Sequence, residues 1–474
     1  MTLDHFEQVF NPRSVAVIGA SNDPIKFGGR YYYSLKERGH RGKLFAVNPS
    51  VTEVDGDRSY ARVQDIPDEI DFAVVAVPAQ FVVQAVADCA EKGVRVVEIL
   101  TAGFAESGTP EGLRWEQQMT DIARSNGMRI IGPNCFGVYN PESALSLLPG
   151  PDFPKEPGPL GLLSQSGGVG SFLIRKAMGL GIRFSKVISY GNACDLNEVD
   201  FLSYFETDTQ TKLVAAYIEG VKDGPRFLEV VKRLSQKKPL LLWKGGLTKL
   251  GSRAVASHTA SLGGSKLIWD GFFRQTGAVP AVGMDELLDL IIGFLCLPDF
   301  RAERVSVVGG GGAITVAACD ALEIAGLSIS EFPPETQAAL RQNLPPTGNS
   351  VKNPVDMGTP VYMPFTLRPA LEIVAASEIV EAVIVEQWVS NYMPTFVQDL
   401  ADVIPSVRDS SGKPFVVTLP EPSTSSDTMD IEETRRKYRE YYLAHGIPVF
   451  DSLQRAANVL GKILRYNRYR ARLK

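Results

Sequence analysis

Residues 15–20 read VAVIGA, an apolar β-branched run that leads directly into the small-residue turn Gly19–Ala20–Ser21. Similar apolar runs follow further along the chain: KLFAVNP (43–49), DFAVVAVP (71–78), VRVVEILT (94–101) and MRIIGPN (128–134). Helical patterns separate them, and one of these, AQFVVQAVADCAEKG, should end at Gly93. Continuous apolar strands that alternate with helices are typical of a parallel sheet covered on both faces. This stretch therefore predicts a doubly wound α/β fold.

The α/β pattern is interrupted twice, which divides the chain into three parts. A proline-rich stretch, LPGPDFPKEPGPL (148–160), ends the first series of strands and helices. The second series begins with GLLSQSGGVG at Gly161 and closes with an apolar helix before the linker LPDFRAER. The third opens with VSVVGGGG at Val305 and ends in a basic helix. We expect three domains, over residues 1–148, 158–298 and 303–474.

The composition is that of an ordinary globular protein and excludes several classes. The chain of 474 residues has 49 Lys+Arg against 54 Asp+Glu, a balance that creates no field for holding DNA or RNA. Its apolar runs are shorter than the ~20 residues that span a bilayer, and its N-terminus has no signal-peptide pattern. The five cysteines and four histidines form no CxxC or zinc pattern. We expect a cytoplasmic protein with no nucleic-acid partner, no membrane segment and no metal site.

Each of the three parts begins with a strand, a small-residue turn and a helix. The turns are Gly19–Ala20–Ser21, Ser166–Gly167–Gly168 and Gly309 to Gly312. Such turns leave backbone N–H groups free at a helix N-terminus, where phosphate or carboxylate binds well. A tight strand-to-helix turn requires glycine in any case, so a single turn is ambiguous. Three in one chain favour anionic ligands.

The first turn does not match a dinucleotide site. VIGASNDPIKFGG lacks the GxGxxG pattern, and the next strand ends in AVNPS, without the acid that would hold a ribose 2′-hydroxyl. The sequence therefore disfavours NAD. Lys26 and Lys43 suit a nucleotide whose ribose carries phosphate, and coenzyme A is one such ligand. A solvated surface charge is the alternative for each lysine.

A segment dense in Gly, Ser, Thr and Ala, KGGLTKLGSRAVASHTASLGG (244–264), predicts a mobile loop or a frayed helix entrance. His258 lies at its centre, with no apolar periodicity that would make it a core residue. A nucleophilic histidine needs one accessible ring nitrogen and a partner that holds the other. Glu219, in the strand-end segment YIEG, is the candidate partner. A surface loop histidine and an exposed strand-end acid are the alternatives.

Together these motifs resemble the α subunits of ADP-forming acyl-CoA synthetases, relatives of succinyl-CoA ligase. The resemblance runs essentially end to end, through SVAVIGAS…PIKFGG, GPNCFG (132–137), SQSGGVG, YIEG, KGG…GSRAVASHTASLGG, NPVD (353–356) and HGIPVF. It implies an α/β protein with a Rossmann-like CoA-binding domain followed by two flavodoxin-like domains. It also implies the reversible conversion of acid, CoA and ATP to acyl-CoA, ADP and phosphate.

The resemblance further implies a phosphorelay. Phosphate attacks an acyl-CoA, the acyl phosphate phosphorylates His258, and the phosphohistidine passes its phosphate to ADP. Glu219 would orient His258, and phosphate would be held at a helix N-terminus by Ser166, Gly167 and Gly168. The residues that would line the CoA site are Gly19, Ser21, Lys26, Asn48 and Pro49. Cys135 would lie near the transfer point, with a small buried residue as the alternative.

The chain departs from this family pattern in two ways. Ala260 and Gly263 exchange the family's usual Gly and Ala, and the third part carries GGGG in place of Asn-Ala-Gly-Gly. No ATP-grasp domain follows the C-terminal helix, which implies a separate ATP-grasp β subunit that holds ADP or ATP and Mg in an α2β2 hetero-oligomer. A CoA or acyl-CoA sensor or scaffold without turnover is the alternative, and an NAD dehydrogenase is the third.

Overall fold

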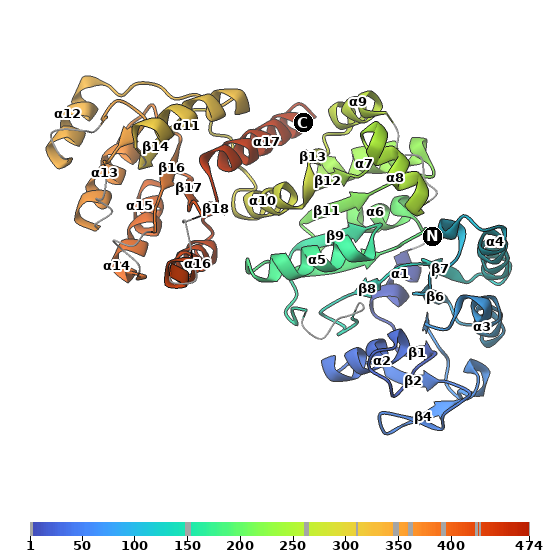
Figure 1. Cartoon of the computed structure of the whole chain (residues 1–474). Coiled ribbons are helices and arrows are strands. Elements are labelled where there is room, and N and C mark those ends of the chain that lie inside the picture. Colours follow the sequence, from blue (N-terminus) through green and yellow to red (C-terminus); the bar gives the residue numbers. More distant parts are fainter. Residues whose placement is uncertain are drawn as a thin grey trace. The chain divides into compact units, whose positions relative to one another are not determined.

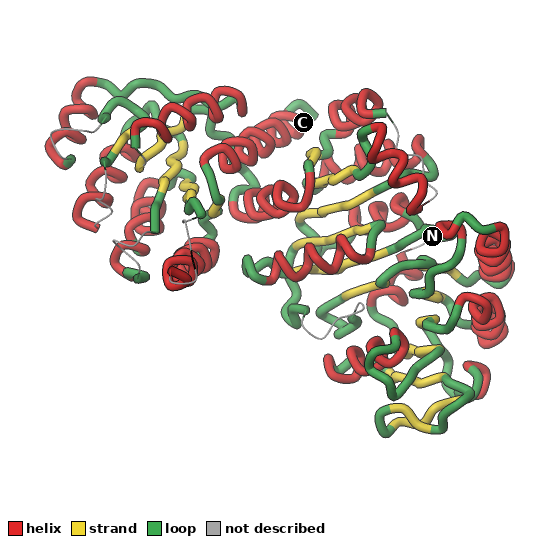
Figure 2. The backbone as a smooth tube through the Cα atoms, viewed as in Figure 1, coloured by secondary structure: helices red, strands yellow, loops and turns green. Residues whose placement is uncertain are grey.

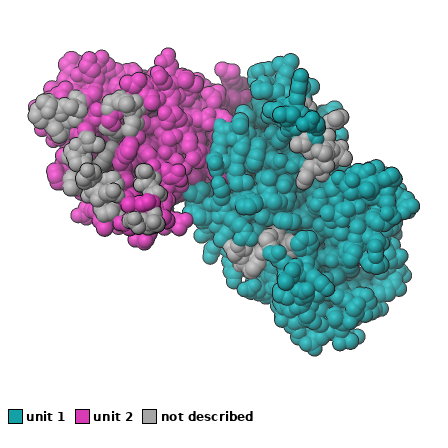
Figure 3. All heavy atoms as spheres, in the orientation of Figure 1, with its two compact units in different colours: residues 1–287 teal, residues 288–474 magenta. Residues whose placement is uncertain are grey.

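The computed structural model describes residues 3–146, 153–259, 265–309, 311–344, 350–358, 364–389, 395–421, 425 and 428–473. The chain forms two compact units, residues 1–287 and 288–474 (Figure 3). The described residues form three sheets, two in the first unit and one in the second (Figure 1). Every sheet has helices packed against it (Figure 2), and the expected α/β fold is confirmed.

The first sheet is parallel apart from one hairpin. Its strands, in spatial order, are β3 (Glu53–Val54), β4 (Asp57–Tyr60), β2 (Lys43–Val47), β1 (Ser14–Ile18), β5 (Phe72–Val75), β6 (Val96–Ile99) and β7 (Arg129–Ile131). The five strands expected from the sequence are all present. The β3–β4 hairpin was not predicted, because its polar sequence EVDGDRSY has no apolar run; positive φ angles at Asp55 and Gly56 form its turn.

Alternating residues of the first sheet divide its core between the two faces. On one face Val15 and Val17 of β1 pack with α2 (Phe27–Arg38). On the other, Ala16 and Ile18 share a cluster with α3 (Ala79–Lys92) and α4 (Pro110–Ser125). The helix α3 ends as expected at Gly93, whose φ of 80° belongs to a left-handed cap. The helix α1 (Leu3–Phe10) precedes β1, and the short turns η1 (Val63–Asp65) and η2 (Ala105–Ser107) follow β4 and β6.

The second sheet takes one strand from residues 137–139, which precede the proline-rich stretch. Its spatial order is β13 (Val279–Ala281), β12 (Leu240–Lys244), β11 (Leu213–Ile218), β9 (Leu160–Ser164), β10 (Phe184–Ser189) and β8 (Gly137–Tyr139). All neighbours are parallel except β8, which pairs antiparallel with β10. Its helices are α5 (Gly167–Met178), α6 (Glu198–Thr207), α7 (Gly224–Lys237), α8 (Lys249–Thr259) and α9 (Lys266–Thr276), and α10 (Gly283–Cys296) follows β13 where the first unit ends. The strand β8 was not predicted.

The third sheet is entirely parallel. Its order is β15 (Val355–Asp356), β14 (Val305–Gly309), β16 (Ala382–Glu386), β17 (Phe415–Thr418) and β18 (Val449–Phe450). Its helices are α11 (Gly312–Ala325), α12 (Pro334–Asn343), α13 (Pro364–Ala376), α14 (Gln398–Ala401), α15 (Val403–Ser411), α16 (Met429–Ala444) and α17 (Leu453–Ala471). The helices α11 and α17 approach so closely that a Cβ at Gly461 would collide with the Ala325 carbonyl. Among the described residues, no helix is both long and apolar enough to cross a membrane.

Candidate active site

A cavity of about 910 Å³ opens at the carboxyl edge of the first sheet, where ligands of open α/β sheets bind. Its wall includes all five residues that the sequence assigns to CoA: Gly19, Ser21, Lys26, Asn48 and Pro49. The exposed rings of Phe27 and Phe81 also line it. The structure therefore brings the five predicted residues together around one cleft.

Close backbone packing shapes the turn that forms one wall of this cavity. Gly19 has a φ of 92°, and a Cβ there would lie 2.7 Å from the Ala76 carbonyl oxygen. A Cβ at Gly28, in the first turn of α2, would collide with the Gly19 carbonyl. Asn48 donates its side-chain N–H to the Ala20 carbonyl at 2.7 Å and so holds the turn against the end of β2. Both glycines are thus required by geometry, because α2 begins directly against the strand–turn backbone.

The two lysines weighed for a phosphate take different positions. Lys26 lines the cavity at the N-terminus of α2, and no ion pair to it is present among the described residues. Lys43 begins β2, at the amino edge of the sheet, and forms an ion pair with Asp68. The expectation that Lys43 serves the nucleotide is therefore wrong, because in a parallel strand its position lies at the edge opposite the ligand cleft.

The second turn opens α5 with unpaired backbone donors. Ser166 is its N-cap, and the Ser166 hydroxyl accepts the Val169 N–H at 3.4 Å. A Cβ at Gly167 would lie 2.7 Å from the Phe136 ring, whereas a Cβ at Gly168 would meet nothing closer than 3.9 Å. No acidic residue lies in this first turn. The geometry suits an anion at the helix N-terminus.

Glu219 lies directly beside this turn. It follows β11, is only 6% exposed, and accepts a hydrogen bond on its carboxylate from the Tyr217 hydroxyl at 2.9 Å. The Gln165 side-chain oxygen accepts the main-chain N–H groups of Glu219 at 2.7 Å and Gly220 at 3.0 Å. Gln165 precedes Ser166, so it ties the expected phosphate turn to the expected orienting acid. Sequence reasoning missed this residue, although it stands inside the SQSGG motif.

His258 lies in a helix and not in a loop. Of the segment 244–264, expected to be a mobile loop or a frayed helix entrance, residues 249–259 form α8, at whose start the Thr248 hydroxyl accepts the Gly251 N–H at 3.0 Å. The helix packs against η2 of the first domain. The His258 ring, and the departures at Ala260 and Gly263, lie outside the described residues. The pairing of His258 with Glu219 therefore stays a prediction.

Side-chain hydrogen bonds join the part of the chain that forms the first sheet to the loop after β10 of the second sheet. Arg129 of β7 makes two hydrogen bonds to the Asp195 carboxylate, at 2.7 and 3.2 Å. The Asn192 amide donates to the carboxylates of Glu106 and Glu116, which lie in and after the η2 turn. These charge-assisted contacts tie the loop after β10 to the first domain.

Cys135 has the environment of a structural residue. It is 2% exposed, and its thiol donates to the Ile99 carbonyl. Burial raises the pKa of the Cys135 thiol well above its usual value. Because the thiolate is the reactive form, the structure favours the buried-residue alternative over a role in transfer.

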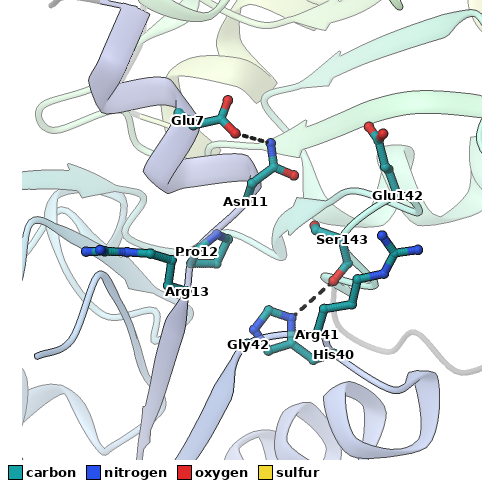
Figure 4. A pocket seen from close by; sticks show the side chains of 9 residues that line it. All are labelled: Glu7, Asn11, Pro12, Arg13, His40, Arg41, Gly42, Glu142 and Ser143. Carbon is teal, nitrogen blue, oxygen red and sulfur yellow. Dashed lines mark hydrogen bonds between the residues drawn. The ribbon is translucent and has the colours of Figure 1, made fainter. Parts of the chain in front are cut away.

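A second hollow of about 500 Å³ lies at the amino edge of the first sheet and holds none of the predicted site residues (Figure 4). Its side chains bind partners both inside and outside it: the Glu7 carboxylate accepts from the Asn11 amide at 2.8 Å, and Arg13 donates to the Asp71 carboxylate at 2.9 Å. The described residues contain no group of three or more His, Cys, Asp or Glu that could hold a metal ion.

Three known domain families match consecutive parts of the chain. Residues 13–141 match a CoA binding domain, residues 157–293 a succinyl-CoA ligase like flavodoxin domain, and residues 305–474 a ligase-CoA domain. The acetate–CoA ligase [ADP-forming] I subunit alpha of Pyrococcus furiosus is 36% identical over 477 residues, which cover 99% of each chain. The chain belongs to the family of ADP-forming acetate–CoA ligase α subunits. The expected ligase class and CoA-binding domain are confirmed.

Other family members give the same assignment. The P. furiosus II subunit alpha is 43% identical over 75% of this chain and 76% of its own. The acetate–CoA ligase [ADP-forming] II of Archaeoglobus fulgidus is 33% identical over 99% of this chain and 68% of its own. Among solved structures, the dinucleotide forming acetyl-coenzyme A synthetase 1 of Ca. Korarchaeum cryptofilum, in complex with phosphate and ADP, has a TM-score of 0.83 at 29% identity, over 98% of this chain and 97% of that chain.

Proposed function

We propose that this α subunit interconverts a small carboxylic acid and its CoA thioester, with phosphate carried on His258. The observation that carries the proposal is the Gln165 bridge. Its side chain binds the backbone of Glu219 while its own position in the chain places it directly before Ser166. The Gln165 side chain thus links the expected anion-binding N-terminus of α5 to Glu219, whose carboxylate could hold an imidazole. Glu219 follows β11, and β11 pairs with β12, the strand that leads into α8.

The proposed relay has two steps on this chain. Phosphate held at Ser166, Gly167 and Gly168 attacks the thioester carbonyl; a C–O bond forms, the C–S bond breaks, and CoA leaves as the thiolate, which takes up a proton. One ring nitrogen of His258 then attacks the phosphorus; the N–P bond forms, and the acyl C(O)O–P bond breaks to release the carboxylate. Glu219 would accept the N–H of the other ring nitrogen and so keep the attacking nitrogen unprotonated and aimed.

We propose that the three parts of the chain, and a separate partner subunit, have different roles. Residues 1–148 would bind CoA through Gly19, Ser21, Lys26, Asn48 and Pro49, residues 158–298 would carry the phosphohistidine, and residues 303–474 would complete the subunit. An ATP-grasp β subunit would hold ADP or ATP and Mg, in an α2β2 assembly. Two relatives named as α subunits support a partner, as does the A. fulgidus ligase, of which this chain covers only 68%. A cytoplasmic location stays a prediction.

The test is transfer of labelled phosphate to the protein in the presence of acyl-CoA. A phosphohistidine is lost in acid and survives alkali, so the expected label has that stability. His258→Ala should abolish it, and Glu219→Gln should slow it by about 10- to 100-fold while CoA binding stays intact, because the nucleophile remains but its orienting partner is lost. Label that persists in His258→Ala would move the chemistry to another residue. No label in the wild type with its partner subunit present would favour a CoA sensor.

A further inference from the structure

Lys244 ends β12 in a setting that is unusual for a lysine. Its residue is only 4% exposed, although Lys is almost never fully buried unless it is paired. Its ammonium donates to the main-chain carbonyl of Glu219 at 2.7 Å and to that of Gly245. A buried charge of this kind is costly, so its contacts call for an explanation beyond packing.

The groups that face this ammonium come from two elements. From β11 and its end come Glu219, the charged group, and Tyr217, whose hydroxyl binds the Glu219 carboxylate. From α9 comes Trp269, whose ring centroid lies 5.3 Å from the Lys244 nitrogen, within the range of a cation–π interaction. Burial lowers the pKa of the Lys244 ammonium to about 8, and the Glu219 charge opposes that shift.

The two carbonyls that Lys244 binds are those of the first residues beyond neighbouring strands. Glu219 follows β11, and Gly245 follows β12 and begins the turn into α8, the helix that contains His258. A Cβ at Gly245 would lie 2.9 Å from the Tyr217 hydroxyl, so the turn also abuts the group that holds the Glu219 carboxylate. One ammonium thus joins the end of the strand that presents Glu219 to the start of the connection that presents His258.

We propose that Lys244 is a positioning residue for the phosphohistidine step: its ammonium holds the ends of β11 and β12 together, so that Glu219 and the His258-bearing helix stay in register. This inference rests on the function proposed above. An uncharged side chain of similar length would fill the same space but leave both carbonyls without the ammonium donor. The turn into α8 would then be held at this point by the main-chain bond from the Gly245 N–H to the Ile218 carbonyl, at 2.9 Å, without the side-chain bonds. The positive charge also balances the buried Glu219 carboxylate.

The same strand provides a matched control at its other end. Lys238 lies two residues before β12 and is half-buried; its ammonium donates to the carbonyls of Phe205 at 2.7 Å and Asp208, and burial lowers its pKa. It lies at the amino edge of the sheet, away from Glu219. Lys238→Met therefore removes a less deeply buried lysine, with two comparable bonds to backbone carbonyls, without touching the proposed site.

The experiment compares Lys244→Met, Lys244→Arg and Lys238→Met by the initial rate of phosphate labelling, with melting curves and CoA titrations on each variant. We expect Lys244→Met to label about 10- to 100-fold more slowly, as is usual when a positioning partner is lost. Lys238→Met should label within about twofold of wild type although it also melts earlier. Lys244→Arg, which keeps a charged donor, should recover much of the rate.

The pH profile separates positioning by charge from a general loss of stability. The wild-type rate should fall above about pH 8 as Lys244 loses its proton, whereas Lys244→Arg should stay flat there, because Arg keeps its charge. Equal slowing of Lys244→Met and Lys238→Met, wild-type labelling by Lys244→Met, or the same alkaline fall in Lys244→Arg would each overturn the inference. Failure of the wild type itself to label would instead overturn the proposed function.

Discussion

Gly167→Ala tests whether the expected phosphate turn is shaped by contact with the first domain. The added Cβ would lie 2.7 Å from Cγ of the Phe136 ring and 2.8 Å from its Cδ1. Cγ is the ring atom attached to Cβ, so rotation of the ring about its own axis does not move it away. The Phe136 backbone is also held in place, because its N–H donates to the Ser189 hydroxyl at 3.0 Å. Overpacking of this kind costs about 1–3 kcal/mol.

The adjacent glycine is the matched control. A Cβ at Gly168 meets only the Ser166 hydroxyl, at 3.9 Å. Gly168→Ala should therefore leave stability unchanged or raise it by about 0.4–1 kcal/mol, because alanine restricts the unfolded chain. Each variant adds one methyl group in the first turn of α5, and the two differ in which atoms that methyl group contacts.

The assay is thermal unfolding followed by circular dichroism. At about 2–4 °C per kcal/mol for a unit of this size, Gly167→Ala should melt roughly 2–12 °C below the wild type. Gly168→Ala should melt at or slightly above the wild-type temperature. If Gly167→Ala melts within about 1 °C of wild type, the Phe136 ring does not constrain the turn and the reasoning is refuted.

Two further predictions concern Glu98 and the nucleotide. Glu98 in β6 is fully buried, accepts the Val138 N–H at 3.0 Å, and has a pKa raised to about 8 by burial. Because the pKa of Glu98 is raised from an ordinary 4.5 to about 8 in the folded state, its contribution to stability is lost as pH rises from about 4.5 to about 8. Glu98→Gln should therefore gain on wild type over that range in urea unfolding, and a pH-independent difference would contradict this. Calorimetric titration should show heat with CoA and none with NAD, and saturable NAD binding without CoA binding would reverse the assignment.

Local sequence patterns determined the central strands and the order in which strands and helices alternate. The apolar runs marked the central strands correctly because a parallel strand buried on both faces must be apolar throughout. Gly93 marked the end of α3 because glycine readily adopts the left-handed backbone conformation that caps this helix. Gly19 and Ser166 marked turns between a strand and a helix because a tight turn of this kind needs small residues, and the sites expected at these turns stay predictions. These signals depend on residues that are near neighbours in the chain.

The tertiary structure alone decided which distant residues meet. It placed β8 in the second sheet and Lys43 at the edge opposite the cleft, and it made a helix of the segment that includes His258. It also brought Gln165 and Lys244 onto the backbone of Glu219, although neither stands out in the chain. The physical reason is that such contacts depend on strand order and on which sheet edge a residue reaches. Both are set by packing between segments far apart in sequence, which no local pattern encodes.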